Sequence, residues 1–271
     1  MVLSNCHTHT TFCDGKSTAE EMVLAALELN FKSLGFTSHS VQHFDTYAMR
    51  FSEEESYRAE IRRLQEKYRR QITIWDGIER DYFSCADIRS YSYYIASVHY
   101  IPFNYRFYAV DGDPEALEEL LNTAYKGDGL ALVRDYYNLV GLYACTYCPP
   151  ILGHFDLIKK YQTSLSLFDS KDDRYFYLAE DALRQVDPSE TLLEVNTGGM
   201  ARGYLNDPYP SEPLLKSWLH MGGRVILSSD CHQAKQMAFA FEETIAMLKR
   251  TGYKKVALLG QERLFEEQSI E

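Results

Sequence analysis

Seven short runs rich in β-branched and aromatic residues recur along the chain, and helical segments separate most of them. Such an alternation is the pattern of repeated β-α units, whose strands pair in parallel. The runs cover residues 2–7, 34–39, 72–79, 93–99, 151–154, 192–196 and 225–230. A further short run at 255–259, followed by an amphipathic tail over 263–269, leaves the strand count at seven or eight. The pattern predicts an α/β fold built from β-α units.

The segments between the runs carry helix-start signals. Ser17 or Thr18, with a glutamate three positions later, predicts a helix that begins near Thr18. A second helix is expected over 52–70, where glutamates come early and basic residues late, as the helix dipole favours. Asp113 followed by proline opens another helix, and 130–143 forms the next. These helices lengthen one connection without adding a domain.

Length and charge limit the classes of protein that this chain can represent. No repeat or Gly/Ser linker divides the 271 residues, so we predict a single domain over 1–271. No apolar run approaches the roughly 18 residues that cross a bilayer, which excludes a membrane span. With 28 Lys and Arg against 39 Asp and Glu, the net charge of −11 disfavours a nucleic-acid partner. The first residues lack the pattern of a secretory signal, so we expect a cytoplasmic protein.

The six cysteines are scattered except for Cys145 and Cys148, whose Cys-x-x-Cys spacing is found in zinc and redox sites. A structural zinc site would need a second pair or a histidine partner at matching spacing, and a redox pair normally lies at a helix start. We therefore predict that all six cysteines are reduced thiols.

Histidines and carboxylates fall where the predicted strands end. Six of the eight histidines do so, together with one glutamate and one aspartate. These residues are His7, His9, His39, Glu79, His99, His154, Asp230 and His232. In a β/α barrel all strands run parallel, and their carboxyl ends meet at one rim, where the active site forms. We therefore expect these side chains to lie close together.

Neutral imidazoles and carboxylates are the ligands that zinc, iron and manganese prefer. Eight such groups exceed the needs of one ion, so two or three adjacent ions are the natural number. Each element alone has a simpler explanation: Glu79 could pair with Arg80, Asp14 could be a turn residue before Gly15, and an isolated histidine is usually structural. The alternate spacing of His7 and His9, which points both to one side of a strand, and the joint placement of the set favour a metal site.

The sequence resembles the polymerase-and-histidinol-phosphatase (PHP) superfamily, whose ordered motifs match the histidine and carboxylate positions along nearly the whole chain. Within it, the chain is most similar to the histidinol-phosphate phosphatases of histidine biosynthesis, through residues 97–101, 153–160 and 194–199. The resemblance implies a distorted seven-stranded β/α barrel of the TIM-barrel-like type with a trinuclear centre at the carboxyl-terminal rim. It also implies that zinc, manganese or iron occupies the centre.

The resemblance assigns a ligand set to each ion, with Glu79 as a bridge. The first ion would be held by His7, His9, Glu79 and Asp230, the second by Glu79, His99 and His154, and the third by Asp14, His39 and His232. Some relatives have histidine where Asp14 stands. Bound metal lowers the pKa of water to about 7, which supplies a hydroxide nucleophile at neutral pH, so no covalent phosphoenzyme would be needed. Glu79 and Asp230, which would hold the ions, are the expected catalytic carboxylates.

Substrate contacts can be suggested beyond the ligands. Arg202 is the expected phosphate clamp, because a guanidinium donates two hydrogen bonds to a phosphate edge, and Lys159 is the second choice. Asp156 would orient His154 or act as the acid, and His43 lies where it could touch substrate. Tyr204 and Tyr209 are the rings to inspect for stacking on a substrate imidazole. An acidic side chain facing the substrate amine is expected, but the sequence does not name it.

The resemblance implies hydrolysis of L-histidinol phosphate, a small phosphomonoester, and two alternatives stay open. One is a phosphoesterase of the same superfamily that acts on nucleotides or other small phosphoesters. The other is a metal-binding module without turnover. No helix shows a sustained heptad seam, so we predict a monomer or weak homodimer.

Overall fold

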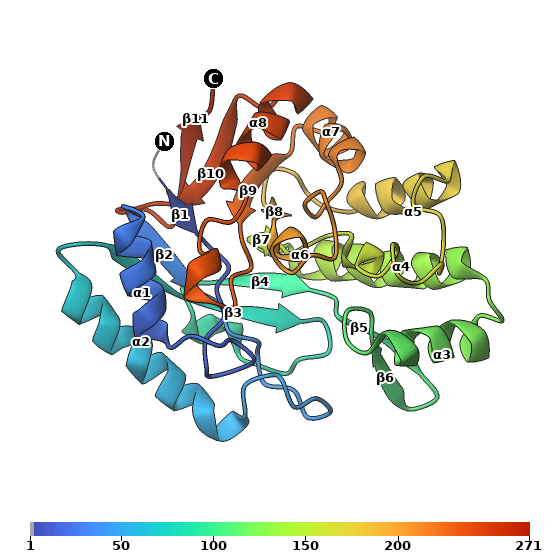
Figure 1. Ribbon diagram of the computed structural model, residues 1–271, viewed down its shortest axis with the longest axis horizontal. Helices are drawn as coiled ribbons and strands as arrows, with labels where there is room; N and C mark the ends of the chain where they lie inside the picture. Colours follow the sequence, from blue (N-terminus) through green and yellow to red (C-terminus); the bar gives the residue numbers. More distant parts are fainter. Residues whose placement is uncertain (1–2) are drawn as a thin grey trace.

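The computed structural model describes residues 3–271, which form a curled parallel sheet with helices around it (Figure 1). The strand order is β1-β2-β3-β4-β7-β8-β9-β10-β11. The strands are β1 (Ser4–Asn5), β2 (Ser33–Phe36), β3 (Thr73–Asp81), β4 (Tyr93–Ser97), β7 (Ile151–Leu152), β8 (Leu192–Asn196), β9 (Arg224–Ser228), β10 (Lys255–Leu259) and β11 (Phe265–Ser269). All neighbours pair in parallel except β10 and β11. The predicted α/β class is therefore confirmed.

Backbone hydrogen bonds join the segments that follow β1 and β9 at the carboxyl-terminal rim of the sheet. The N–H of His9 donates to the carbonyl of Cys231 at 2.9 Å, and the N–H of Cys231 donates to the carbonyl of His7 at 3.1 Å. These bonds form a parallel bridge between Thr8 and Cys231, directly beyond β1 and β9. Within residues 3–271, strands β1, β2, β3, β4, β7, β8 and β9 thus form the distorted barrel that was predicted.

The remaining strands lie outside this ring of seven parallel strands, although β10 also contacts β1 and contributes Ala257 and Leu259 to the interior. The eighth predicted strand is present as β10, which pairs with β9 through Ala257 and Ile226. The tail predicted over 263–269 is mostly the strand β11, which runs antiparallel to β10. A separate hairpin of β5 (Tyr100–Phe103) and β6 (Arg106–Ala109) follows β4 directly.

The helices cover the outside of the sheet and pack on one another. They are α1 (Ala19–Glu28), α2 (Glu54–Tyr68), α3 (Pro114–Ala124), α4 (Gly129–Tyr147), α5 (Asp173–Leu183), α6 (Gly198–Ala201), α7 (Glu212–His220) and α8 (Phe241–Thr251). Short 3-10 turns occur at Phe51–Glu53, Ile88–Ser90, Leu157–Lys159 and Ala234–Gln236. Figure 1 shows α1 and α2 on one side of the sheet and α3 to α5 on the other.

Helix starts follow the predicted capping signals. The Thr18 hydroxyl accepts a hydrogen bond from the backbone N–H of Glu21, and the Glu21 carboxylate accepts one from the backbone N–H of Thr18, which completes a capping box at α1. Asp113 caps α3 with proline at the first helical position. Strand ends were predicted less well, because β1 ends at Asn5 and β2 stops at Phe36. Residue 2, where the first strand was predicted to begin, lies outside the described residues.

The barrel interior is small and apolar below the rim. Tyr93 fills it and donates its hydroxyl to the carbonyl of Cys6 at 2.6 Å. Gly35 and Gly77 make room for this ring, since a Cβ at either position would overlap it. The side chains that define the function are therefore restricted to the rim above Tyr93.

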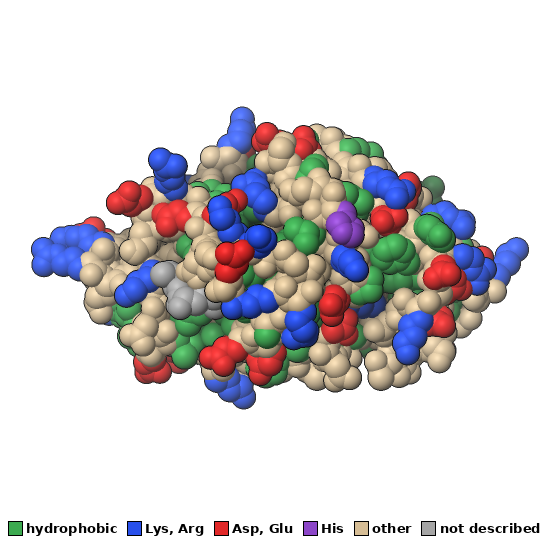
Figure 2. All heavy atoms as spheres, turned by 90° about the horizontal axis from the view of Figure 1, so that it is seen from above, with side chains coloured by type: hydrophobic (Ala, Val, Ile, Leu, Met, Phe, Trp, Pro, Cys, Tyr) green, Lys and Arg blue, Asp and Glu red, His purple; other side chains and the backbone are tan. Residues whose placement is uncertain are grey.

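The structure also describes the cysteines, the charged side chains of one face and the length of the helices. The six cysteines are free, and Cys145 and Cys148 lie at the end of α4 instead of at a helix start. Figure 2 shows basic and acidic side chains interspersed over the face that it presents. Among the described residues, no helix has the length and apolar character to span a membrane.

Candidate metal centre

The rim brings together every residue that the sequence nominated as a ligand. These residues include three groups, and within each group the potential ligand atoms all lie within 4.8 Å of one another. They are His9, Asp14, His39 and His232; His7, His9 and Asp230; and His39, Glu79 and His99. His9 and His39 belong to two groups each, so the groups form one continuous cluster.

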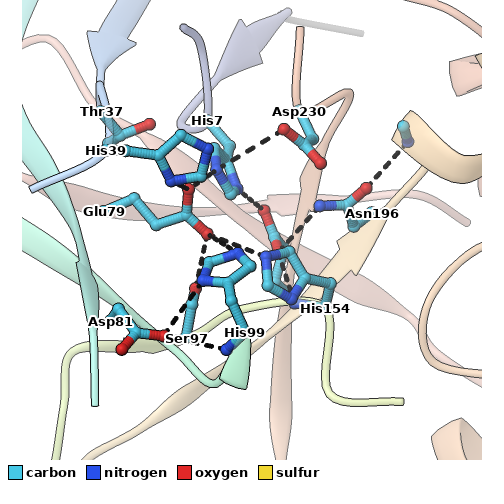
Figure 3. A network of polar contacts seen from close by, with 12 residues as sticks. His7, Thr37, His39, Glu79, Asp81, Ser97, His99, His154, Asn196 and Asp230 are labelled. Atoms are coloured by element: carbon cyan, nitrogen blue, oxygen red, sulfur yellow. Dashed lines mark hydrogen bonds and ion pairs between the residues drawn. The ribbon is translucent and has the colours of Figure 1, made fainter. Parts of the chain in front are cut away.

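Glu79, in β3, is the centre of this cluster (Figure 3). Its Oε2 lies 2.9 Å from Nδ1 of His39, 3.2 Å from Nε2 of His7 and 3.4 Å from Nε2 of His9. Its Oε1 lies 2.8 Å from Nε2 of His154 and 3.3 Å from Nε2 of His99. Burial alone would raise the pKa of this carboxyl, but the surrounding histidines lower the pKa well below its usual range. Glu79 is therefore an ionised carboxylate with both oxygens directed at imidazoles.

Asp230 follows β9 and faces the same cluster. Its Oδ1 lies 3.2 Å from Nε2 of His9, while its Oδ2 accepts a hydrogen bond from Nη2 of Arg202 at 2.9 Å. The residue has a φ of 46°, in the left-handed region that few non-glycine residues adopt. Such strain persists where the surrounding structure fixes it, which is common at functional sites.

Asp14 lies on the open side of the cluster. Its Oδ2 is 3.1 Å from Nε2 of His232, and its Oδ1 is 3.7 Å from both Nδ1 of His9 and Nε2 of His39. The Asp14 side chain is one-third exposed. This carboxylate therefore lies between the solvent and the rings of His39 and His232.

The donor set fits divalent transition-metal ions. Nε2 of His7, Nε2 of His9 and Oε2 of Glu79 are buried and make no hydrogen bond, although they lie close together. Buried polar atoms normally find partners, and buried charges are paired or coordinate metals. Imidazole and carboxylate atoms that converge in this way without a hydrogen-bond partner provide the coordination that a metal ion requires. We therefore regard the cluster as a candidate metal centre.

The groups overlap with the implied ligand sets but differ from them at four residues. His9 also lies with Asp14, His39 and His232, and Glu79 is not in the group of His7, His9 and Asp230. His154 was predicted with His99, and it contacts Glu79 but belongs to none of the three groups. His39 was predicted with Asp14 and His232, and it also lies with Glu79 and His99. Because both ring nitrogens of His39 face carboxylates, this residue lies between two potential ion positions.

Glu194, which sequence analysis did not single out, accepts hydrogen bonds from residues of the cluster and so fixes their orientation. Its Oε1 accepts from Nδ1 of His7 and from Oγ of Ser228, both at 2.6 Å. Its Oε2 accepts from the backbone N–H of His154 at 2.7 Å and from Nδ2 of Asn196 at 3.1 Å. A carboxylate that fixes the outer nitrogen of a histidine orients its other nitrogen toward a metal.

Asp81 performs the same task for His99. Its Oδ2 accepts from the backbone N–H of His99 at 2.9 Å and lies 3.3 Å from Nδ1 of that ring. The signal for both supports was present in the sequence: Glu194 is a carboxylate inside an apolar strand, and Asp81 stands two residues after Glu79, on the same side of β3.

A cavity of about 210 Å³ opens above the cluster. It is lined by Asp14, His39, Tyr47, Glu79, His99, Asp111, Gly112, His154, Leu157, Lys160, Arg202, Asp230 and His232. Arg202, the predicted phosphate clamp, lines this cavity beside Asp230 and His232. The second cation in the lining is Lys160, whose neighbour Lys159 was the one predicted.

The structure gives Lys159 a different environment from the predicted phosphate contact. Its ammonium lies 3.1 Å from Oδ2 of both Asp156 and Asp207, donates to the carbonyl of Pro208, and is 2% exposed. Two carboxylates already neutralise its charge. Lys160 follows it in a 3-10 turn, where successive side chains point in different directions, so only Lys160 reaches the cavity.

Four other nominated residues, Asp156, His43, Tyr204 and Tyr209, lie outside the cavity lining. Asp156 is fully buried, pairs with Lys159 and accepts from the backbone of Ser211, and no hydrogen bond joins it to the ring of His154. His43 is exposed, with Nε2 at 3.5 Å from Sγ of Cys85. Tyr209 packs edge-on to His154, with ring centroids 6.5 Å apart. The role predicted for Asp156, to orient His154 or act as the acid, and the substrate contact predicted for His43 therefore gain no support from the geometry.

Comparisons with known proteins agree with this geometry. The PHP domain model matches residues 5–198. A histidinol-phosphatase of Bacillus subtilis is 26% identical over 261 residues, which cover 87% of this chain and 96% of the relative.

Two solved structures show the same fold. A protein of Listeria monocytogenes, named only provisionally as a histidinol phosphatase, has a TM-score of 0.78 at 21% identity, covering 89% of this chain and 99% of that one. Histidinol phosphate phosphatase of Lactococcus lactis, complexed with zinc, L-histidinol and phosphate, has a TM-score of 0.70 at 20% identity, covering 96% and 98%. With the family model matching more than half of its residues, the chain belongs to the PHP domain family.

Proposed function

We propose that this chain is a metal-dependent phosphomonoesterase that hydrolyses L-histidinol phosphate to L-histidinol and phosphate. The observation that carries the proposal is the rim cavity, where three groups of metal-type ligands meet the two cations Arg202 and Lys160. The substrate is suggested by the histidinol-phosphatase of Bacillus subtilis, which is similar over most of both chains. The ligands of the Lactococcus structure, L-histidinol and phosphate, are the two products of this reaction.

The cluster would hold two or three divalent ions, which we propose to be zinc, manganese or iron. The proposed ligands are His7, His9, Glu79 and Asp230 for one ion, Glu79, His99 and His154 for another, and Asp14, His39 and His232 for a third. Such ions supply Lewis acidity and an activated water at neutral pH.

Protein groups would bind and orient the phosphoryl group. Arg202 and Lys160 reach the cavity and neutralise charge on the phosphoryl oxygens, which is the main demand of phosphoryl transfer. The Arg202 guanidinium is held in place by Oδ2 of Asp230, which raises its pKa against the effect of burial and keeps it charged. Glu79 and Asp230 are the carboxylates that face the reacting ester and hold the cluster.

We further propose that residues 1–271 act as one catalytic unit. The family model ends at residue 198, but three proposed site residues follow it: Arg202, Asp230 and His232. Asp230 and His232 lie beyond β9, whose end closes the rim against β1. The site is therefore complete only with the carboxyl-terminal part of the chain.

The adjacent lysines allow a direct test of the phosphate contact. Lys160→Gln should lower kcat/KM about ten- to hundredfold, because it removes a charge from the cavity wall, and should lower the melting temperature less than Lys159→Gln does. Lys159→Gln should mainly lower the melting temperature, because it leaves two carboxylates without their cation. A larger catalytic loss for Lys159→Gln at equal stability would restore the sequence prediction and contradict the structural assignment.

The substrate is tested by a panel of small phosphomonoesters and phosphodiesters, nucleotides among them, assayed for phosphate release by metal-loaded protein. We expect L-histidinol phosphate to have the highest kcat/KM. A nucleotide that is turned over faster would favour the other phosphoesterase activity, and metal binding without any turnover would favour a non-catalytic module.

A further inference from the structure

The cavity contains one carboxylate that the metal centre does not use. Within the described residues, four carboxylates line it: Asp14, Glu79, Asp111 and Asp230. Three of these belong to the groups of potential metal ligands, whereas Asp111 belongs to none. The Asp111 side chain is 26% exposed, so it contributes a negative charge to the cavity wall and remains accessible.

The backbone fixes Asp111 beside the metal centre. The hairpin of β5 and β6 begins directly after His99 and returns to it, since the N–H of Val110 donates to the carbonyl of His99 at 2.8 Å. The carbonyl of Asp111 accepts from the hydroxyl of Tyr161 at 2.9 Å and also from Nζ of Lys160. The position of Asp111 is therefore fixed by the backbone of His99 on one side and by the side chains of Lys160 and Tyr161 on the other.

The carboxylate of Asp111 retains capacity to accept hydrogen bonds. Its Oδ2 lies 3.6 Å from the Lys160 ammonium, which is longer than a direct hydrogen bond. Lys160, with smaller contributions from His99 and other cluster histidines, lowers the pKa of Asp111 against the effect of burial, so the group is ionised. A cationic ligand group could thus bind Asp111 without displacing a hydrogen-bond donor.

The proposed substrate has a matching pair of charges. In L-histidinol phosphate the ammonium is bonded to the second carbon from the ester oxygen, so it must lie close to the phosphoryl group. A phosphate held near Arg202 and Lys160 places that ammonium within the same small cavity. The remaining carboxylates there face imidazoles of the cluster, which leaves Asp111 as the anion available to it.

Resting on the function proposed above, we propose that Asp111 binds the substrate ammonium and so selects phosphomonoesters that carry a primary amine next to the ester. Lys160 and Asp111 then act as a pair, with the lysine facing the phosphate and the aspartate facing the amine. This assigns the acidic partner of the amine that sequence analysis expected but did not name.

The test compares Asp111→Asn with wild type on two substrates: L-histidinol phosphate and its analogue lacking the amine, 3-(imidazol-4-yl)propyl phosphate. Loss of a charge-assisted hydrogen bond should lower kcat/KM for the amine substrate about ten- to hundredfold, mainly through KM. The analogue should change much less, so the preference for the amine should largely disappear. Asp113→Asn is the matched control, because it removes the same charge two residues away, at an exposed helix cap that asparagine also serves.

The outcomes separate this proposal from the function on which it rests. An equal loss on both substrates, or no loss on either, overturns the role of Asp111 while leaving the phosphatase function intact. Wild-type protein that hydrolyses neither compound overturns both. Calorimetric binding of L-histidinol to the metal-loaded proteins gives a second reading without turnover, and weaker binding by Asp111→Asn at an unchanged melting temperature supports the proposal.

Discussion

Replacing Glu79 by glutamine should reduce turnover by about a thousandfold or more and lower the metal content of the protein. This carboxylate is 1% exposed, and its two oxygens lie within 3.4 Å of ring nitrogens of five histidines. Glutamine preserves the size of the side chain but removes the charge and one of the two acceptor oxygens. An ion that depends on the bridge would lose both a ligand and charge balance.

The measurement pairs phosphate release with elemental analysis of the same preparation. Glu55→Gln, on the exposed part of α2, is the control for loss of one negative charge. Full turnover and undiminished metal in Glu79→Gln would show that this carboxylate is not the centre of the site.

Glu194→Gln should weaken metal binding and activity about ten- to hundredfold, although Glu194 is not in the proposed ligand sets. The carboxylate is completely buried and accepts four hydrogen bonds, from His7, His154, Asn196 and Ser228. A glutamine amide would turn an NH₂ group toward two of these donors, which leaves buried groups without partners. His7 would then lose the contact that directs its Nε2 at Glu79.

Metal affinity, measured by competition with a chelator, is the readout that separates positioning from simple stability. Glu190→Gln, at an exposed position just before β8, is the matched control. If Glu194→Gln lowers the melting temperature of the metal-free protein but leaves metal affinity and kcat unchanged, then Glu194 supports only the fold.

The cluster could be predicted because its members are tied to strand ends. Residues that follow parallel strands must meet at one rim, so a list of histidines and carboxylates at such positions already describes a site. The structure places His7, His39, Glu79, His99 and Asp230 together for this reason. The position of Asp14 does not follow from a strand end, because this residue lies in a loop. It joins the cluster through its contact with His232.

The residues that were missed depend on tertiary contacts that a sequence pattern does not contain. The choice between Lys159 and Lys160 is decided by the direction of two adjacent side chains in one short turn, and by Asp207, which lies 48 residues further along the chain. Asp111 reaches the cavity because a hairpin returns the chain to His99. The strand β11 was missed as a strand because a five-residue run gives little periodicity, and its pairing with β10 decides its structure.

The central claim is that metal ions held at this rim hydrolyse L-histidinol phosphate. The most direct measurement is phosphate release from this compound by chelator-treated protein, before and after titration with zinc or manganese, with bound metal counted on the same samples. We expect negligible turnover without metal and recovery as two or three ions per chain are bound. Full turnover by metal-free protein would contradict this claim.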